Sequence, residues 1–135
     1  RQWSLVDNKD LCYHWLGDFD REMLKVIKSQ KNFQDTPVTE IWHDDGDQVL
    51  CFMRGDLVFV FNFSPTRSYT DYGFLVPTGS YDVVLNTDSK DFGGNGFADD
   101  SMTHTTNFDP LYVNDKKEWL KLYIPARSAV VLKKN

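Results

Sequence analysis

Acidic side chains and histidines are the residues of this sequence whose types could do chemistry. The chain has 20 Asp and Glu residues and 3 His residues. Breaking or transferring a glycosidic bond needs two carboxyl groups at a fixed separation across a cleft, one of them with a raised pKa. Most acidic residues here stand among turn-forming residues, where solvation is expected to leave the pKa of a carboxyl group in its usual range. We therefore predict no catalytic residue in this chain.

Two histidines have neighbours that could suggest a site. His43 precedes Asp44 and Asp45, but the step from Asp45 to Gly46 is typical of a turn. No third ligand accompanies them, so we predict no metal site. His104 stands among threonines, with no Ser or Cys in the context of a nucleophile elbow. Nucleophilic catalysis through His104 is therefore not expected.

A glycine-rich segment spans residues 91–96. It precedes no expected helix and lacks the Lys-Ser/Thr ending of a phosphate-binding loop, so we predict no nucleotide or other cofactor. Its glycines are expected to supply backbone angles that other residues avoid, so that the loop folds tightly against another part of the chain. The tripeptide 54–56 (Arg-Gly-Asp) is interpreted as a hairpin connection rather than an adhesion motif.

Aromatic residues make up 15% of the chain, enough for a core and for a second packed surface. Exposed members could stack on sugar rings, whereas a β-sandwich core also absorbs such side chains. Both interpretations stay open. The candidates for sugar stacking are Trp42, Trp119, Tyr69, Tyr72 and Tyr112.

The net charge of −5 argues against nucleic acid or an acidic membrane as partner, because both require a basic patch. Cys12 and Cys51 show no metal-ligand spacing, and we expect two reduced thiols rather than a disulfide. With no long apolar span, this predicts a cytoplasmic protein. Because the sequence begins at Arg1 without Met, we expect it to be a piece of a longer chain.

Helical periodicity is confined to the first part of the chain. We predict a short helix near residues 8–16, an interruption at Gly17 and a longer helix near 19–30 capped by Asp18. The resulting apolar stripe must be buried, either on the domain that follows or on a part of the protein outside this sequence. The stripe consists of Leu11, Trp15, Phe19, Met23 and Ile27.

From Pro37 onward the apolar period changes to two, and turn residues separate short strands. This predicts an all-β fold, an antiparallel Greek-key β-sandwich of about seven or eight strands behind a short N-terminal helical segment. The predicted domain boundary separates residues 1–36 from 37–135. The predicted strands cover residues 38–42, 49–53, 57–63, 70–76, 81–86, 102–108, 119–124 and 128–133.

The strand at 57–63 is apolar on both faces. Leu57, Phe59, Phe61 and Phe63 alternate with two valines. A strand of this kind is covered on both sides. One face belongs to the sandwich core, and we expect the N-terminal helix or a neighbouring domain to cover the other.

These segments resemble one known family. The sequence LVFVFNFSPTRSYTDY closely resembles the start of the C-terminal domain of glycogen and starch branching enzymes, of the alpha-amylase superfamily, and is closer to the eukaryotic type. Ser64 departs from the His that is typical there, and residues 97–99 lack an expected Arg. The segments that carry the resemblance are 57–72, 79–88, 91–94 and 123–131, with 1–7 and 16–23 similar to the last helical region of the family's catalytic barrel.

The resemblance implies a parent enzyme that cuts an α-1,4-glucan and rejoins the piece as an α-1,6 branch. In that family a carboxylate nucleophile and a carboxylic acid/base act from the barrel, upstream of this sequence. Residues 1–36 would then be the end of the barrel, and 37–135 an accessory domain that packs on the barrel and stabilises it. The alternatives are a non-catalytic glucan-binding module, or the C-terminal domain of an amylase or debranching enzyme.

Overall fold

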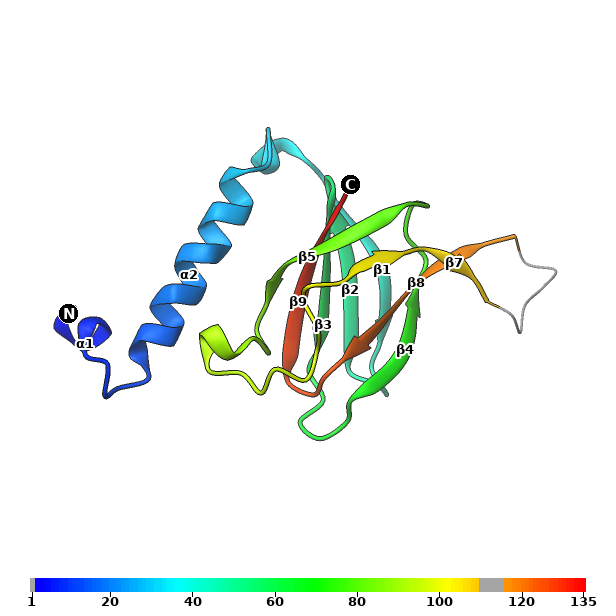
Figure 1. Ribbon diagram of the computed structural model, residues 1–135. Coiled ribbons are helices and arrows are strands. Elements are labelled where there is room, and N and C mark those ends of the chain that lie inside the picture. Colours follow the sequence, from blue (N-terminus) through cyan, green and yellow to red (C-terminus); the bar gives the residue numbers. More distant parts are fainter. Residues whose placement is uncertain (1, 110–115) are drawn as a thin grey trace.

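The computed structural model describes residues 2–109 and 116–135 and consists of two antiparallel β-sheets with a helix alongside (Figure 1). The predicted all-β class with an N-terminal helical segment is confirmed. The helical elements are α1 (Ser4–Asp7), α2 (Tyr13–Lys28), η1 (Phe33–Asp35) and η2 (Lys90–Phe92). The strands are β1 (Val38–Asp44), β2 (Val49–Arg54), β3 (Leu57–Asn62), β4 (Tyr69–Phe74), β5 (Ser80–Asn86), β6 (Thr103–Thr105), β7 (Asn107–Phe108), β8 (Glu118–Ile124) and β9 (Ser128–Lys134).

The larger sheet has the strand order β1-β2-β3-β9-β5-β6, and the smaller has β4-β8-β7. The last strand, β9, is inserted between β3 and β5, so neighbours in this sheet are not neighbours in sequence, as in Greek-key connections. The sheets face each other across one core. Val58 and Val60 enter it from the larger sheet, and Leu120 and Leu122 enter it from the smaller one.

Strands β1, β2 and β3 form two consecutive hairpins, through the turn predicted at Asp45-Gly46 and the connection predicted at 54–56, with one difference in the first turn. In the loop at 45–48, the residue with a left-handed backbone conformation is Gln48 (φ 58°) and not Gly46. In the second hairpin Gly55 has φ 61°, which matches the glycine preference of a tight two-residue connection. The Arg-Gly-Asp tripeptide is therefore a hairpin connection, as predicted.

The strand predicted at 102–108 is two strands, β6 and β7, which belong to different sheets. The chain crosses between the sheets at Thr106, which is buried. Its Oγ1 accepts a hydrogen bond from the Gly79 amide at 3.0 Å and donates to Glu118 Oε2 at 2.8 Å. Thr106 therefore ties the two sheets together at the point where the chain leaves one for the other.

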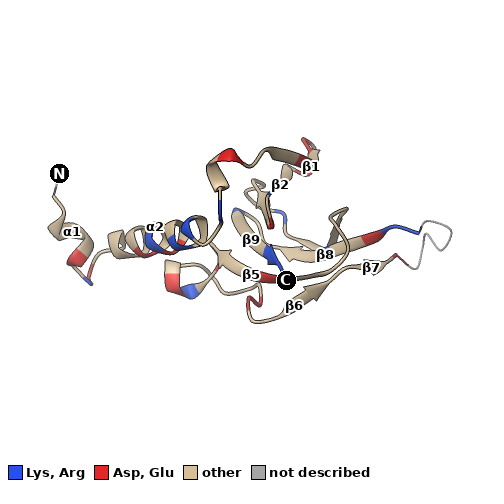
Figure 2. Cartoon of the chain, turned by 90° about the horizontal axis from the view of Figure 1, so that it is seen from above, with Lys and Arg blue, Asp and Glu red and all other residues tan. Residues whose placement is uncertain are grey.

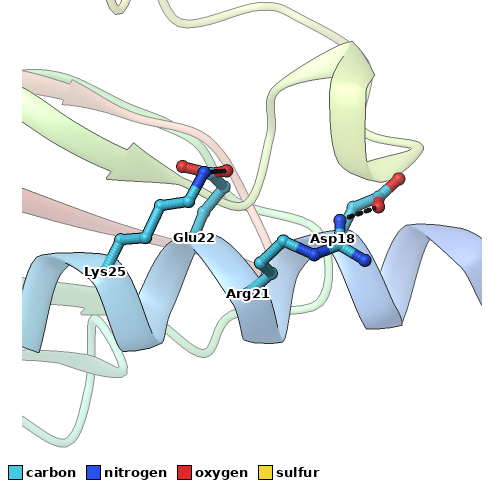
Figure 3. Close-up of polar contacts among 4 residues, drawn as sticks. All are labelled: Asp18, Arg21, Glu22 and Lys25. Atoms are coloured by element: carbon cyan, nitrogen blue, oxygen red, sulfur yellow. Dashed lines mark hydrogen bonds and ion pairs between the residues drawn. The ribbon is translucent and has the colours of Figure 1, made fainter.

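The helical prediction was wrong in its boundaries. Gly17 lies inside one continuous helix, α2, and does not interrupt it, and the expected helix at 8–16 is replaced by the short α1. A Cβ at position 17 would lie 3.0 Å from Val6 Cγ1, so the glycine lets α1 approach α2. Asp18 is not a cap, because it forms an ion pair with Arg21 on the solvent side of α2 (Figure 3).

Glu22 and Lys25 form a second exposed pair one turn further along α2 (Figure 3). Exposed pairs of this kind stabilise a helix by about 0.3–0.5 kcal/mol each. Lys25 and Lys28 stand in the last turn, on the favourable side of the helix dipole. The side chains of both ion pairs occupy exposed positions of α2.

The predicted stripe on α2 packs on the outer face of the larger sheet, the face turned away from the core between the sheets. Phe19 and Met23 join a second apolar cluster built on Leu57, Leu85 and Val131. This answers one question left open by the sequence: the helix covers part of the second face of β3. No residue of α2 is fully buried, so this cover is partial.

The glycine-rich loop closes on the same helix. Gly93 has φ 77° and lies directly beneath the Trp15 ring. Phe92 meets Phe19 edge to face, with ring centroids 5.4 Å apart. The prediction that these glycines allow tight folding against another part of the chain is confirmed.

Both cysteines are free, as predicted: Cys12 is exposed and Cys51 lies in the core. Burial raises the pKa of the Cys51 thiol to about 12. Cys51 therefore acts as a small apolar core residue.

Candidate functional site

Trp42, Tyr69 and Tyr72 come together where β1 meets β4 at one edge of the sandwich. The Trp42 indole donates from Nε1 to the Tyr72 hydroxyl at 3.1 Å. Tyr69 and Tyr72 meet edge to face with ring centroids 5.3 Å apart. Three of the predicted glucan contacts therefore form one cluster, although they are far apart in the sequence.

The polar groups of this cluster are already used inside the protein. The Tyr72 hydroxyl donates to Asp47 Oδ2 and the Tyr69 hydroxyl to the Asp47 carbonyl, each at 2.9 Å. Desolvation is the main cause that raises the pKa of Tyr72 to about 12, and the bond from Trp42 opposes it. Both tyrosines also pack against the core. The cluster closes the sandwich edge, and Trp42, 46% exposed, is the member that offers a free aromatic surface.

Trp119 does not belong to this cluster. Its ring packs over Gly73, where a Cβ would lie 3.6 Å from Trp119 Cε3. Because Trp119 alternates with the buried Leu120 and Leu122, its side chain lies on the outer face of the smaller sheet. Tyr112 lies outside the described residues.

The two histidines occupy separate places. His43 Nδ1 lies 2.8 Å from Glu40 Oε1, and this carboxylate raises the pKa of the exposed imidazole. Asp44 accepts the Asp47 amide at 2.7 Å, so it belongs to the turn. His104, on β6, lines a cleft between the sheets, and desolvation lowers its pKa. Neither has a Ser or Cys partner among the described hydrogen bonds.

The outer face of the larger sheet carries four phenylalanines, which we call the phenylalanine ladder: Phe52, Phe59, Phe61 and Phe63. The rings of Phe52 and Phe59 stack with their centroids 4.8 Å apart. The rings of Phe61 and Phe63 stack with centroids 5.6 Å apart and an angle of 4° between the ring planes. Phe63 is 60% exposed. Between the ladder and α2 lies an almost wholly apolar cleft of about 240 Å³. This face is thus only partly covered.

Helix α2 carries a second apolar set that points to solvent. Tyr13, Leu16 and Leu24 recur at helical spacing beside the packed stripe, and Leu16 is 65% exposed. Trp3, near α1, is 68% exposed. Seen from above, α1 and the first turns of α2 extend away from the sheets (Figure 2). A soluble domain rarely presents so many large apolar side chains together unless a partner covers them.

Sequence reasoning missed the residues that organise the loop after β5. Asp88, which is buried, accepts the backbone amides of Asn95 at 3.2 Å, Phe97 at 2.6 Å and Ala98 at 3.1 Å. Asn86 Oδ1 accepts the Asp88 amide at 2.9 Å. The sequence Asn-Thr-Asp is typical of a turn in which a side chain accepts a nearby backbone amide. The hydrogen bonds from residues 95–98 to Asp88 cannot be predicted from the sequence.

The fold and these sequence features define the class of protein. The family described as "Alpha amylase, C-terminal all-beta domain" matches residues 41–135. The chain belongs to this family, and the match covers β2 to β9 and most of β1.

Relatives identify the enzymes in which such a domain occurs. The chain is 38% identical over 133 residues to a 1,4-alpha-glucan-branching enzyme of Saccharomyces cerevisiae and 39% identical over 134 residues to one of Emericella nidulans. It is 35% identical over 137 residues to the horse enzyme of the same name. Each alignment covers 98% of this chain and 19% of the relative. The predicted resemblance to branching enzymes of the eukaryotic type is confirmed.

The chain therefore spans about one fifth of the length of the curated relatives it matches. Among the described residues, no helix is long and apolar enough to cross a membrane.

Proposed function

We propose that this chain is the C-terminal accessory domain of a 1,4-alpha-glucan branching enzyme and that it packs on and stabilises the catalytic barrel of the same polypeptide. The proposal rests on a difference between where the alignment with the relatives begins and where the family match begins. The relatives align with 98% of the chain, whereas the C-terminal domain family begins only at residue 41. The segment that contains α1 and α2 is thus aligned with the relatives but precedes the residues that the family model matches.

The packing of α2 supports this assignment. One side of the helix is fixed on the outer face of the larger sheet through Phe19 and Met23. The adjacent side exposes Leu16 and Leu24. A helix that is apolar on two sides and half covered is suited to lie between two domains. In this proposal α2 is the last helix of the barrel, and the phenylalanine ladder continues the same interface.

The chemistry of the parent enzyme lies elsewhere in this proposal. The relatives are named for branching of a 1,4-alpha-glucan, and the carboxylate pair of such a transfer would belong to the barrel. The 135-residue chain is expected to have no branching activity of its own. Its two free cysteines agree with a parent enzyme of the cytoplasm.

The experiment compares one substitution in two contexts. Leu16→Asp and Leu24→Asp place a charge on exposed positions, so they should leave the unfolding midpoint of the 135-residue chain nearly unchanged. In the full-length parent the same substitutions should lower the unfolding midpoint of the barrel, because a buried unpaired charge is costly. Leu75→Asp, at an exposed position just after β4, is the matched control and should act equally in both contexts.

Equal effects of Leu16→Asp and Leu75→Asp in the full-length enzyme would refute the docking role of α2. Branching activity of the purified 135-residue chain, measured by iodine staining of amylose, would refute its assignment as a non-catalytic domain.

Glucan binding at Trp42 is a second candidate function, favoured by one observation. Tyr72 fixes the Trp42 indole through a hydrogen bond while the ring stays 46% exposed, so it is a preorganised surface for a sugar ring. Affinity electrophoresis through glycogen tests it: Trp42→Ala should abolish any retardation, and Trp3→Ala, also exposed, should not. Unchanged migration of the unsubstituted chain would exclude this function.

A further inference from the structure

A second cleft lies between the two sheets, well apart from the phenylalanine ladder. Its volume is about 240 Å³. Val83 and Val130 form the wall from the larger sheet, and Leu122 of β8 and Pro125 just after β8 form the opposite wall. Phe97, in the loop that follows η2, stands at its rim. Pockets for drug-sized ligands measure about 300–1,000 Å³, so this cleft suits a ligand of one ring.

Asn86 provides a hydrogen-bond donor without a partner on this cleft. It pairs with Val130 in the register of β5 and β9, so its side chain lies on the same face as Val130, toward the cleft. Because its Oδ1 accepts the Asp88 amide, the orientation of the side-chain amide is fixed and Nδ2 is free to donate. Nδ2 is buried and has no acceptor among the described residues. A donor left in this state calls for an acceptor from elsewhere.

Phe97 is held in place although it is 67% exposed. The Asp88 carboxylate accepts the amides of Phe97 and Ala98, and the Asp88 carbonyl accepts the Gly96 amide at 2.7 Å. A Cβ at Gly94 would overlap the backbone of Asp88, so the loop tolerates little change. A buried carboxylate thus fixes the backbone from which the exposed Phe97 ring projects at the rim of the cleft.

The other polar groups that line the cleft are either uncharged or able to accept hydrogen bonds. Strand β7 pairs with β8 only at Glu118 and Trp119, so the later part of β8 has a strand edge without a partner among the described residues. This edge offers backbone donors and acceptors. His104 also lines the cleft, and desolvation lowers its pKa and so favours the neutral imidazole, which can both donate and accept a hydrogen bond. No Lys or Arg lines the cleft within the described parts of the chain.

We propose that this inter-sheet cleft binds one glucosyl unit of an α-glucan, with the sugar's C–H face on Phe97 and a hydroxyl oxygen accepting from Asn86 Nδ2. An aliphatic ligand would leave the Asn86 donor unpaired, and an anionic ligand would find no cation. A neutral ring with hydroxyl groups satisfies both the aromatic and the polar groups. The choice of glucan among neutral sugars rests on the proposed function.

The test is a titration of the ¹⁵N-labelled 135-residue chain with maltotriose, followed by two-dimensional NMR. The chain has a core of its own between the two sheets, so it can be studied alone. Addition of maltotriose should shift the Asn86 side-chain amide and the backbone amides of Phe97 and Ala98. Saturation is expected at millimolar concentrations, as for a single-ring site.

Two variants separate binding from folding. Phe97→Ala removes an exposed ring and should weaken maltotriose binding about tenfold without changing the fold. Phe108→Ala removes a ring of similar exposure, 57%, that does not line the cleft, and should bind as the unsubstituted chain does.

Three results would overturn the proposal: no shifts around the cleft at saturating maltotriose, equal affinities of Phe97→Ala and Phe108→Ala, or shifts confined to the Trp42 cluster. The last result would support glucan binding at Trp42 instead. All three leave the docking role of α2 untouched, because that role is decided by the Leu16→Asp comparison in the full-length enzyme.

Discussion

The contact between Trp15 and Gly93 gives a direct test of how α2 is held on the β-domain. A Cβ added at position 93 would lie 2.6 Å from Trp15 Cδ2 and 2.8 Å from Cζ3, and the residue has φ 77°. Gly93→Ala therefore introduces two separate costs. One is a left-handed backbone conformation for a residue with a side chain, and the other is steric overlap with the indole.

The two costs have different magnitudes and different partners. A left-handed conformation costs about 1–2 kcal/mol in a non-glycine residue. Overpacking against a ring costs about 1–3 kcal/mol. We expect Gly93→Ala to lower the free energy of unfolding by about 2–5 kcal/mol. In a Trp15→Ala background only the backbone cost remains, so the coupling energy of the double-mutant cycle should be about 1–3 kcal/mol.

Urea denaturation followed by circular dichroism at the helix band measures these free energies. Hydrogen exchange of the α2 amides then shows whether the helix opens separately from the sheets. Gly96→Ala is the matched control. It also has a positive φ, 68°, but the atoms nearest to its Cβ would belong to the flexible side chain of Lys90, the first at 3.1 Å. Its cost should therefore be about 1–2 kcal/mol and independent of Trp15.

A Gly93→Ala penalty that stays the same with and without the Trp15 ring would refute the reasoning. It would mean that the indole does not press on Gly93, and that α2 is held by its other apolar contacts, among them Phe19 and Met23.

Three further predictions concern the domain itself. Asn62→Ala removes three hydrogen bonds of a buried side chain and should lower the free energy of unfolding in urea by about 2–4 kcal/mol. A disulfide reagent should modify Cys12 in the folded chain and Cys51 only after unfolding, because burial raises the Cys51 pKa to about 12; rapid reaction of two thiols per folded chain would contradict this. Glu40 raises the pKa of His43, so their pairing stabilises the fold at pH values below the ordinary histidine pKa, and this stabilisation is lost as pH rises through the raised value. An NMR titration should therefore give a lower His43 pKa in Glu40→Gln, and an unchanged pKa would refute the pairing.

The strands could be predicted from sequence because their signal is local. In the stretch from Leu57 to Phe63, alternation alone shows that both faces are apolar, and both apolar clusters of the structure meet there. The division of 102–108 into two strands was not predictable. It depends on Thr106 bonding to Gly79 and Glu118, which are distant in sequence.

The prediction of the helix boundaries was wrong for a related reason. Gly17 has a low helix propensity, which favoured a break, but in the structure it lies against Val6 of α1. Asp18 has the character of a cap, yet it pairs with Arg21 along the helix surface. In both cases a neighbour outweighs the local preference.

The candidate aromatic residues were predicted by type, but their roles depend on strand register. Trp42, Tyr69 and Tyr72 meet only because β1 and β4 border the same edge of the sandwich. Trp119 was expected to be equivalent, but it lies on the other face of the smaller sheet. Its sugar-binding role, like that of the cluster, stays a prediction.

The position of β9 has a consequence for synthesis on the ribosome. Strand β9 lies between β3 and β5, so the larger sheet cannot close until Ser128–Lys134 have been translated. Until then β3 and β5 present unpaired edges, which expose the growing chain to wrong pairings and aggregation. A protein truncated before β9 should therefore be a substrate for chaperones and proteases, even if every residue before the truncation is unchanged.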